Sequence, residues 1–409
     1  MASFPLNVLD LASQLDWGRL CRTPFHPGIW AVLEPAGLQN HAPQLCWIRP
    51  NTLACVWMAG GQEGTAGMSI MLSLLDPKTG CWTSPNCVSQ DAERSEQNPL
   101  LFLTEAGLQL IHSAQRARDL SDHSWQGSGS SFSMQWTAAL RHQHCSNSAM
   151  SEVDSPDLAD ALLATSWSKA VDLLPQPAFC RNPPYQRPDG CWLLPIYRSL
   201  EEGGAFGHDH SQVLLLEADG QPTNQIFEVP ESKGRVHGSI VPSADGSRLL
   251  QFFRSRLADC IYLSTSTIDG EEWSAPQPID LPNNNSSIQA LRLASGRLAM
   301  IFNRFGLEFD MSDDANPWGE AKWPRTRWPL AIALSEDDGA NWPWIRDIDT
   351  GWGFCGNENW HLNGQLAYPT LLEGPSAALH LAYSWAGRTA IRYACLEEEE
   401  ILGITKAEG

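Results

Sequence analysis

Long apolar segments are missing from this sequence of 409 residues. No stretch reaches the roughly 18 to 20 uninterrupted apolar residues of a membrane-spanning helix, so we expect no membrane partner. The first 20 residues have no basic region and carry Asp10 and Asp16 in their apolar part, unlike a secretory signal peptide. The eleven cysteines are an odd number without Cys-x-x-Cys spacing, which favours reduced thiols over a disulfide framework. Together these features predict a cytoplasmic protein.

Basic residues are also scarce. Lys and Arg number 27 against 47 Asp and Glu, which gives a net charge of −20. No basic cluster is visible that could bind the phosphates of a nucleic acid. The sequence has no phosphate-binding loop, zinc-ligand cluster or Gly-x-Ser-x-Gly motif. The spacing of His208 and His210 would suit a metal, but nothing nearby completes a ligand set. We therefore expect no nucleic-acid partner, no metal and no cofactor.

Helical periodicity is rare, whereas short apolar runs bounded by Gly, Pro, Asn or Asp are frequent, which predicts an all-β chain. Six of these runs open with a polar residue and are followed, after a turn, by a second strand. Their units start about 65 residues apart on average, and six units account for nearly the whole chain. The opening residues are His41, Asn98, Asn182, His237, Asn285 and Tyr368.

Six similar β-units predict a six-bladed β-propeller of four-stranded antiparallel blades, formed by one domain over residues 1–409. The last unit has only three strands, so we expect residues 29–33 to supply the fourth and close the ring. Irregular spacing places insertions near residues 116–156, as a long loop or extra hairpin, and near residues 306–326. The repeat also explains the 18 tryptophans mainly as blade-packing residues.

A turn motif recurs in phase with these units. Ser335-Glu-Asp337-Asp-Gly339-Ala-Asn341-Trp342 matches the Asp-box pattern S-x-D-x-G-x-T-W except for Asn341, and residues 266–273 form a weaker copy. In such a turn the aspartate caps backbone amides, the glycine adopts a conformation that other residues resist, and the tryptophan packs between sheets. The motif predicts a fold, not an activity.

These features resemble the sialidase superfamily, specifically the sialidase-like Asp-box (BNR-repeat) propellers, over residues 38–396. The resemblance implies an active site at the axial mouth. Sialidases hold a sugar carboxylate with three arginines, attack with a tyrosine helped by a glutamate, and protonate the leaving group with an aspartate. By resemblance, Tyr368 is the candidate nucleophile, and Arg254 and Arg327 are candidate anion-binding residues.

The sequence departs from the family pattern at three of its site positions. The phrase that normally carries the first arginine reads Asn40-His41-Ala42-Pro43, and the glutamate position is occupied by His237. Glu63 is the nearest candidate for the general acid. We therefore expect His237 to act as the base for Tyr368 and Glu63 as the acid.

The six opening residues also predict a polar axial pocket without reference to a family, although they could instead bind channel water and cap strands. Candidate substrate-binding residues are Arg254, Arg327, His41, Asn98, Asn182 and Asn285, with Trp360 as a pocket wall.

Our leading hypothesis is a sialidase-like enzyme that hydrolyses a small acidic glycoside or a related anionic substrate. Two alternatives stay open. One is a non-catalytic propeller that binds glycans or proteins. The other is a lyase or cyclase that uses the same pocket, with histidine and tyrosine as an acid/base pair.

Overall fold

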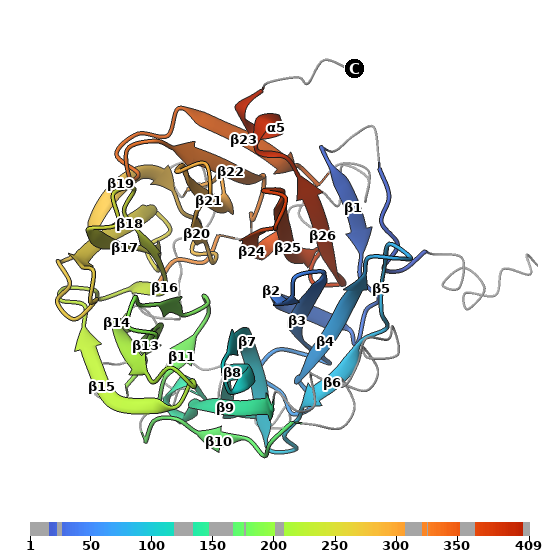
Figure 1. Ribbon diagram of the computed structural model, residues 1–409. Coiled ribbons are helices and arrows are strands. Elements are labelled where there is room, and N and C mark those ends of the chain that lie inside the picture. The colour runs from blue at the N-terminus through green and yellow to red at the C-terminus, as the bar shows by residue number, and fades with distance from the viewer. Residues whose placement is uncertain are drawn as a thin grey trace, which may run out of the picture.

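The computed structural model describes residues 16–22, 27–117, 134–146, 167–175, 177–200, 208–306, 321–324, 326–351 and 365–403. Within these residues, six antiparallel sheets are arranged around a central axis, as Figure 1 shows. The predicted six-bladed, all-β propeller is therefore confirmed. None of the helices in this part of the chain is long and apolar enough to span a membrane.

The blades follow one another along the chain, each with its strands in order from the centre outward. Blade one holds β2 (Gln39–Arg49), β3 (Thr52–Gly60), β4 (Ser69–Asp76), β5 (Cys81–Trp82) and β6 (Asn86–Ser89). Blade two holds β7 (Arg94–Thr104), β8 (Gly107–Arg116), β9 (Ala139–Ser146) and β10 (Val171–Asp172). Blade three holds β11 (Phe179–Cys180), β12 (Tyr185–Gln186), β13 (Trp192–Arg198), β14 (His210–Leu216) and β15 (Pro222–Glu228).

The remaining blades complete the ring. Blade four holds β16 (Arg235–Pro242), β17 (Arg248–Ser255), β18 (Cys260–Thr267) and β19 (Gln277–Pro282). Blade five holds β20 (Gln289–Arg292), β21 (Leu298–Asn303), β22 (Leu330–Ser335) and β23 (Trp344–Asp349). Blade six holds β24 (Ala367–Glu373), β25 (Leu379–Trp385), β26 (Ala390–Leu396) and β1 (Ile29–Val32). A short helix, α5 (Glu398–Leu402), and a 3-10 turn, η2 (Met134–Thr137), lie outside the sheets.

The N-terminal strand closes the ring as predicted. β1 pairs antiparallel with β26, from Ile29 opposite Cys395 to Val32 opposite Arg392, and the two strands lie side by side in Figure 1. This pairing joins the first and last parts of the chain in one sheet. It also covers the edge that β26 would otherwise leave open.

The Asp box forms the expected turn between β22 and β23, the third and fourth strands of blade five. The Asp337 carboxylate accepts hydrogen bonds from the Asn341 backbone amide at 2.8 Å and from its side chain at 2.7 Å. Gly339 has a φ of +89°, which a residue with a side chain adopts only with strain. The Trp342 ring meets Phe252 of blade four edge-on, with centroids 6.3 Å apart. The turn therefore ties blade five to blade four.

Five blades share a residue with a left-handed backbone at or next to the polar residue that opens the sequence unit. Four of the six opening residues have left-handed backbones with φ between 51° and 56°, namely Asn98, His237, Asn285 and Tyr368. In blade one the left-handed residue is Ala42, directly after His41. The strand register shifts beside four of these five positions, in blades one, two, four and six. Such bulges redirect side chains and are frequent next to functional sites.

The predicted insertions differ from the structure in one part. Residues 139–146, which we expected in a loop or extra hairpin, form β9, the regular third strand of blade two. That part of the prediction was wrong because the polar residues RHQHCS lack the hydrophobic alternation that indicates a strand. The strand they form pairs with β8 over its whole length. Most of the second insertion, residues 307–320, lies outside the described residues.

Candidate functional site

Tyr368 lies at the centre of the candidate site, at the start of the inner strand β24. Its phenol oxygen accepts a hydrogen bond of 2.7 Å from Nη1 of Arg254. Burial alone would raise the pKa of Tyr368, but the guanidinium groups of Arg254 and Arg327 outweigh this effect and lower it below the usual 10. The environment therefore favours the phenolate, the form of tyrosine that is a useful nucleophile.

Arg254 is held in place from its other side. It is fully buried near the end of β17, and its Nε donates to Oδ1 of Asn285 at 2.7 Å. Asn285 in turn donates from Nδ2 to the backbone oxygen of Lys322 at 2.5 Å. The remaining Nη2 of Arg254 is buried and has no hydrogen-bond partner among the described residues. A buried guanidinium with an unused donor is suited to hold an anionic ligand or water.

Arg327 provides a second guanidinium beside Tyr368, 5.8 Å from the centre of its ring. Its backbone oxygen accepts from the Leu366 amide at 3.1 Å and from Nδ2 of Asn303 at 2.9 Å, which fixes it against the segment that leads into β24. Burial lowers the pKa of Arg327 to about 10, and Arg388 and Arg254 contribute to the shift. Arg254 and Arg327, the two candidate anion-binding residues, thus both lie beside the ring of Tyr368.

Two histidine rings flank the tyrosine ring. His41 lies 4.2 Å away between ring centres, and His237 meets the ring edge-on at 5.4 Å. Burial, followed by the nearby arginines, lowers the pKa of both imidazoles well below 6.5, so both are neutral at pH 7. Nδ1 of His237 is buried without a partner in the described part of the chain. A neutral imidazole with a free nitrogen can accept or relay a proton.

Glu63 lies in the loop that follows β3. Its carboxylate forms an ion pair with Arg388, which belongs to the turn between β25 and β26. Both side chains are partly exposed, Glu63 by 35% and Arg388 by 23%. In this arrangement Glu63 acts as an acceptor, so the predicted role as a general acid requires the ion pair to open.

The other predicted residues are placed differently. Asn182 donates from Nδ2 to three backbone oxygens, those of His237, Gly238 and Ile288, so its amide links blade three to blades four and five. Asn98 is 6% exposed and lies within β7, at the register shift between Gln97 and Leu100. Trp360 lies outside the described residues. Among the described residues, Trp323 also lies beside the arginines, with its ring centre 5.5 Å from the guanidinium carbon of Arg254 and 5.3 Å from that of Arg256.

Several residues of the site were not predicted from the sequence. Arg181 follows β11 in blade three and is 1% exposed. Its Nη2 donates to the backbone oxygens of Tyr368 at 2.8 Å, Pro369 at 3.1 Å and Pro43 at 3.2 Å, so it reaches across the centre of the propeller to blades six and one. Burial lowers the pKa of Arg181 to about 10. It holds the left-handed backbone of the candidate nucleophile in place.

A buried ion pair was also missed. Nε of Arg256 donates to Asp209 at 2.8 Å, and both side chains are almost completely buried. Arg256 lies two residues beyond Arg254, and residues two apart in a strand point to the same face of the sheet. This spacing could have predicted that the two guanidinium groups lie on the same face. Around Asp209, only the spacing of its neighbours His208 and His210 stood out in the sequence. Within the described ranges, no group of three or more His, Cys, Asp or Glu side chains could hold a metal ion.

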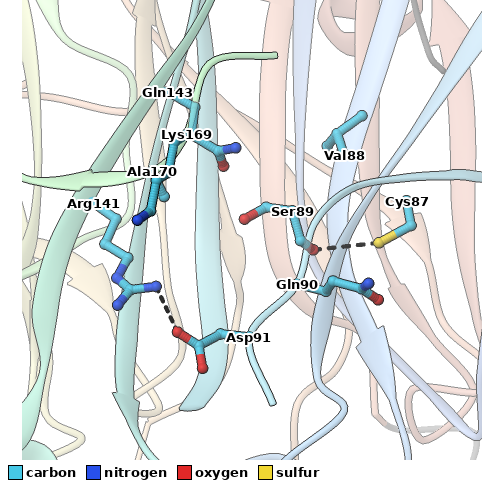
Figure 2. Close-up of a pocket in the computed structure, with 9 residues that line it drawn as sticks. All are labelled: Cys87, Val88, Ser89, Gln90, Asp91, Arg141, Gln143, Lys169 and Ala170. Carbon is cyan, nitrogen blue, oxygen red and sulfur yellow. Dashed lines mark hydrogen bonds and ion pairs between the residues drawn. The ribbon is translucent and has the colours of Figure 1, made fainter. Parts of the chain in front are cut away.

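A separate cavity of about 470 Å³ lies between blades one and two. Figure 2 shows Ser89, Asp91, Arg141 and Gln143 in its wall, with Arg141 paired to Asp91 at 2.7 Å. None of the site residues predicted from the sequence lines this cavity. It is therefore distinct from the cluster around Tyr368.

The pKa of Tyr368 gives a direct spectroscopic prediction. Burial raises the pKa of each of the other five tyrosines, Tyr262 to about 12, whereas that of Tyr368 is lowered. We expect an absorbance titration of the folded protein to show one phenolate forming below pH 10. Tyr368→Phe should remove this step and Tyr185→Phe should retain it. A step of full size in the Tyr368→Phe variant would show that the assignment is wrong.

Comparisons with known proteins identify the family and the fold of the chain. Residues 51–381 match the model of the BNR repeat-like domain family. No curated protein matches the chain. Among solved structures, the Hadza microbial sialidase Hz136 is similar with a TM-score of 0.63 and 12% identity, over 89% of this chain and 67% of that one. A Dyadobacter fermentans protein of unknown function gives a TM-score of 0.63 and 13% identity, over 90% and 97%.

The Trypanosoma rangeli sialidase in complex with the inhibitor DANA is similar with a TM-score of 0.61 and 11% identity, over 91% of this chain. The chain spans 57% of that protein's length. At these identities the structural likeness shows the fold alone. The family match covers most of the chain, and it agrees with the Asp-box turns and the six blades. The chain therefore belongs to the BNR repeat-like domain family and is a sialidase-like six-bladed propeller.

Proposed function

We propose that this protein is a glycoside hydrolase whose axial site acts on a small glycoside bearing a carboxylate or a similar anionic group. The observation that carries the proposal is the hydrogen bond from Arg254 to the phenol oxygen of Tyr368, with Arg327 beside the same ring. Guanidinium groups that lower the pKa of a tyrosine provide both an activated nucleophile and a binding site for an anion.

In the proposed first step, the phenol oxygen of Tyr368 attacks the anomeric carbon as the bond to the leaving group breaks. The phenol proton passes to the neutral imidazole of His237, and the leaving-group oxygen takes a proton from Glu63. Sialidases are known as the glycosidases that use a tyrosine nucleophile. Arg254 stabilises the phenolate before the attack and after the release of the product.

In the second step, water attacks the same carbon and the bond to Tyr368 breaks. Glu63 takes one proton from this water, which restores the acid, and the remaining hydroxyl joins the sugar. The phenolate then recovers its proton from His237. The same two residues thus serve in both halves of the reaction, as microscopic reversibility requires.

The charge of the site supports an anionic substrate. Among the described residues, five guanidinium groups lie within electrostatic range of Tyr368, those of Arg181, Arg254, Arg256, Arg327 and Arg388. Two of them are paired with carboxylates, Arg256 with Asp209 and Arg388 with Glu63. The cluster is therefore locally positive, although the whole chain has a net charge of −20. Such a cluster attracts an anionic substrate and repels a cationic one.

The test is a mass-spectrometric screen of fluorogenic glycosides, in which each carboxylated sugar is matched by its methyl ester. We expect cleavage of at least one acidic glycoside and much slower cleavage of its ester. Cleavage of neutral and acidic glycosides at equal rates would contradict the anionic-substrate assignment. Binding of acidic sugars without turnover of any of them would instead favour the non-catalytic alternative.

A further inference from the structure

The cavity between blades one and two has buried polar side chains in its walls. Its volume of about 470 Å³ is within the roughly 300 to 1,000 Å³ of small-molecule sites. Ser89 on the blade-one side is 7% exposed, and Gln143 on the blade-two side is 6% exposed. Figure 2 shows these two side chains on opposite walls. None of the described lining residues is aromatic, so hydrogen bonds and charge, rather than stacking, would hold a ligand here.

Ser89 and Gln143 both offer hydrogen-bond acceptors. The Ser89 hydroxyl donates its proton to Oε1 of Glu96 at 2.8 Å, so toward a ligand its oxygen can only accept. Gln143 donates from Nε2 to the Ser168 oxygen at 3.1 Å. Burial lowers the pKa of nearby His112 to about 4, an effect that Gln143 partly opposes, yet Oε1 of Gln143 forms no hydrogen bond within the described part of the chain. A buried carbonyl oxygen without a partner costs free energy, and a hydroxyl group of a ligand would remove that cost.

Positive charge is available on the blade-two side of the cavity. Lys169 is exposed, and its ammonium group has no carboxylate partner among the described residues. Arg141, on the same wall in Figure 2, is held by two carboxylates, Asp91 at 2.7 Å and Asp172 at 3.3 Å. Lys169 is therefore the cation of the described lining that remains available to an anionic group.

We propose that this cavity is a second ligand site, which binds a small hydroxylated carboxylic acid such as a sugar acid. Lys169 binds the carboxylate at the exposed side, and Ser89 and Gln143 accept hydrogen bonds from the hydroxyl groups at the buried side. A neutral sugar would leave Lys169 without an anion, and a simple anion such as chloride would leave Gln143 without a donor. The cavity shares no residue with the cluster around Tyr368, so this proposal does not depend on the proposed function.

Cys87 provides a local probe, because it lines the cavity and is exposed. The test measures its alkylation by iodoacetamide with peptide mass spectrometry, and the exposed Cys21, which does not line the cavity, is the internal control. Burial raises the pKa of the Cys87 thiol, so the reaction is run at alkaline pH. We expect D-glucuronate, at a concentration about ten times its Kd, to slow the alkylation of Cys87 about 10-fold and to leave that of Cys21 unchanged. D-Glucose should protect neither thiol.

Variants assign this protection to the named residues. Lys169→Gln should remove it, and Lys169→Arg should retain most of it, because the charge is kept. Gln143→Leu should raise the concentration of D-glucuronate needed for half protection about 10-fold, the effect of losing one hydrogen bond. Lys78→Gln, which removes an exposed lysine outside the cavity, is the matched control and should keep full protection. Arg254→Gln should keep it as well, because Arg254 belongs to the axial cluster.

The contrary results are equally specific. Equal protection by D-glucuronate and D-glucose would overturn the requirement for a carboxylate, and protection that survives Lys169→Gln would overturn the role of Lys169. Protection that disappears in Arg254→Gln would show that the cavity is not a separate site. If D-glucuronate protects Cys87 at no concentration, the second site does not exist, whereas cleavage of acidic glycosides at the axial site would be unaffected. Thermal unfolding of each variant controls for folding.

Discussion

Replacement of Tyr368 by phenylalanine is expected to lower kcat on an acidic glycoside by about 10³-fold or more, while the Kd of the substrate changes little. The substitution removes the oxygen that would form the bond to the sugar. It leaves Arg327, Arg388 and the two histidine rings in place. Steady-state kinetics give kcat, and direct binding of the same glycoside gives Kd.

The control is Tyr185→Phe, because Tyr185 lies on β12 and takes part in none of the contacts around Tyr368 described above. This variant should keep normal kcat and binding. Full activity of Tyr368→Phe would exclude a tyrosine nucleophile. A parallel loss of binding and turnover would instead mean that the phenol serves mainly to hold the substrate or the site.

Replacement of Arg254 by glutamine is expected to lower kcat/KM by about 10²- to 10³-fold, the effect of losing one preorganised donor at a charged reacting group. Arg254 is the donor to the phenol oxygen and the first cation that lowers the pKa of Tyr368. Its removal should therefore raise that pKa. Any rise of activity with pH that depends on the phenolate should move to higher pH in the variant.

Arg248→Gln is the matched control, because Arg248 is exposed and begins the same strand, β17. It should change neither activity nor the titration of Tyr368. A reduced kcat/KM in Arg254→Gln with an unchanged phenolate titration would contradict the proposed stabilisation of the phenolate. The loss would then reflect binding of the substrate anion alone.

The fold could be predicted because its determinants are local and repeated. The pattern of apolar strands recurs six times, and the Asp box at residues 335–342 fixes the phase of the repeat. Strand β9 was missed because its residues are polar and only the pairing with β8 reveals it. A pattern based on hydrophobic alternation does not detect such a strand.

The site could be predicted only in part. Tyr368, Arg254 and Arg327 fall at repeat positions that a family pattern marks, and the structure brings them together. Arg388 and Arg181 could not be found in this way, because neither falls at a position that the family pattern marks. Their place depends on contacts between blades, which the spacing of a single repeat does not encode.

The net charge of the chain gave little guidance to the site. A total of −20 disfavours nucleic acid, but it says nothing about the centre of the propeller. There the guanidinium groups outnumber the carboxylates, and burial strengthens their effect on Tyr368. The distribution of charge over the fold, rather than its sum, determines which ligand the site attracts.

The central claim is that Tyr368 forms a bond to the sugar, and mass spectrometry of the trapped protein tests it most directly. The protein is incubated with a fluorinated acidic glycoside that reacts quickly with the nucleophile and is released slowly, then digested and mapped. We predict that the peptide containing Tyr368 gains the mass of one sugar, and that Tyr368→Phe gains none. Turnover of the reagent without an adduct, or an adduct on another residue, would contradict the account.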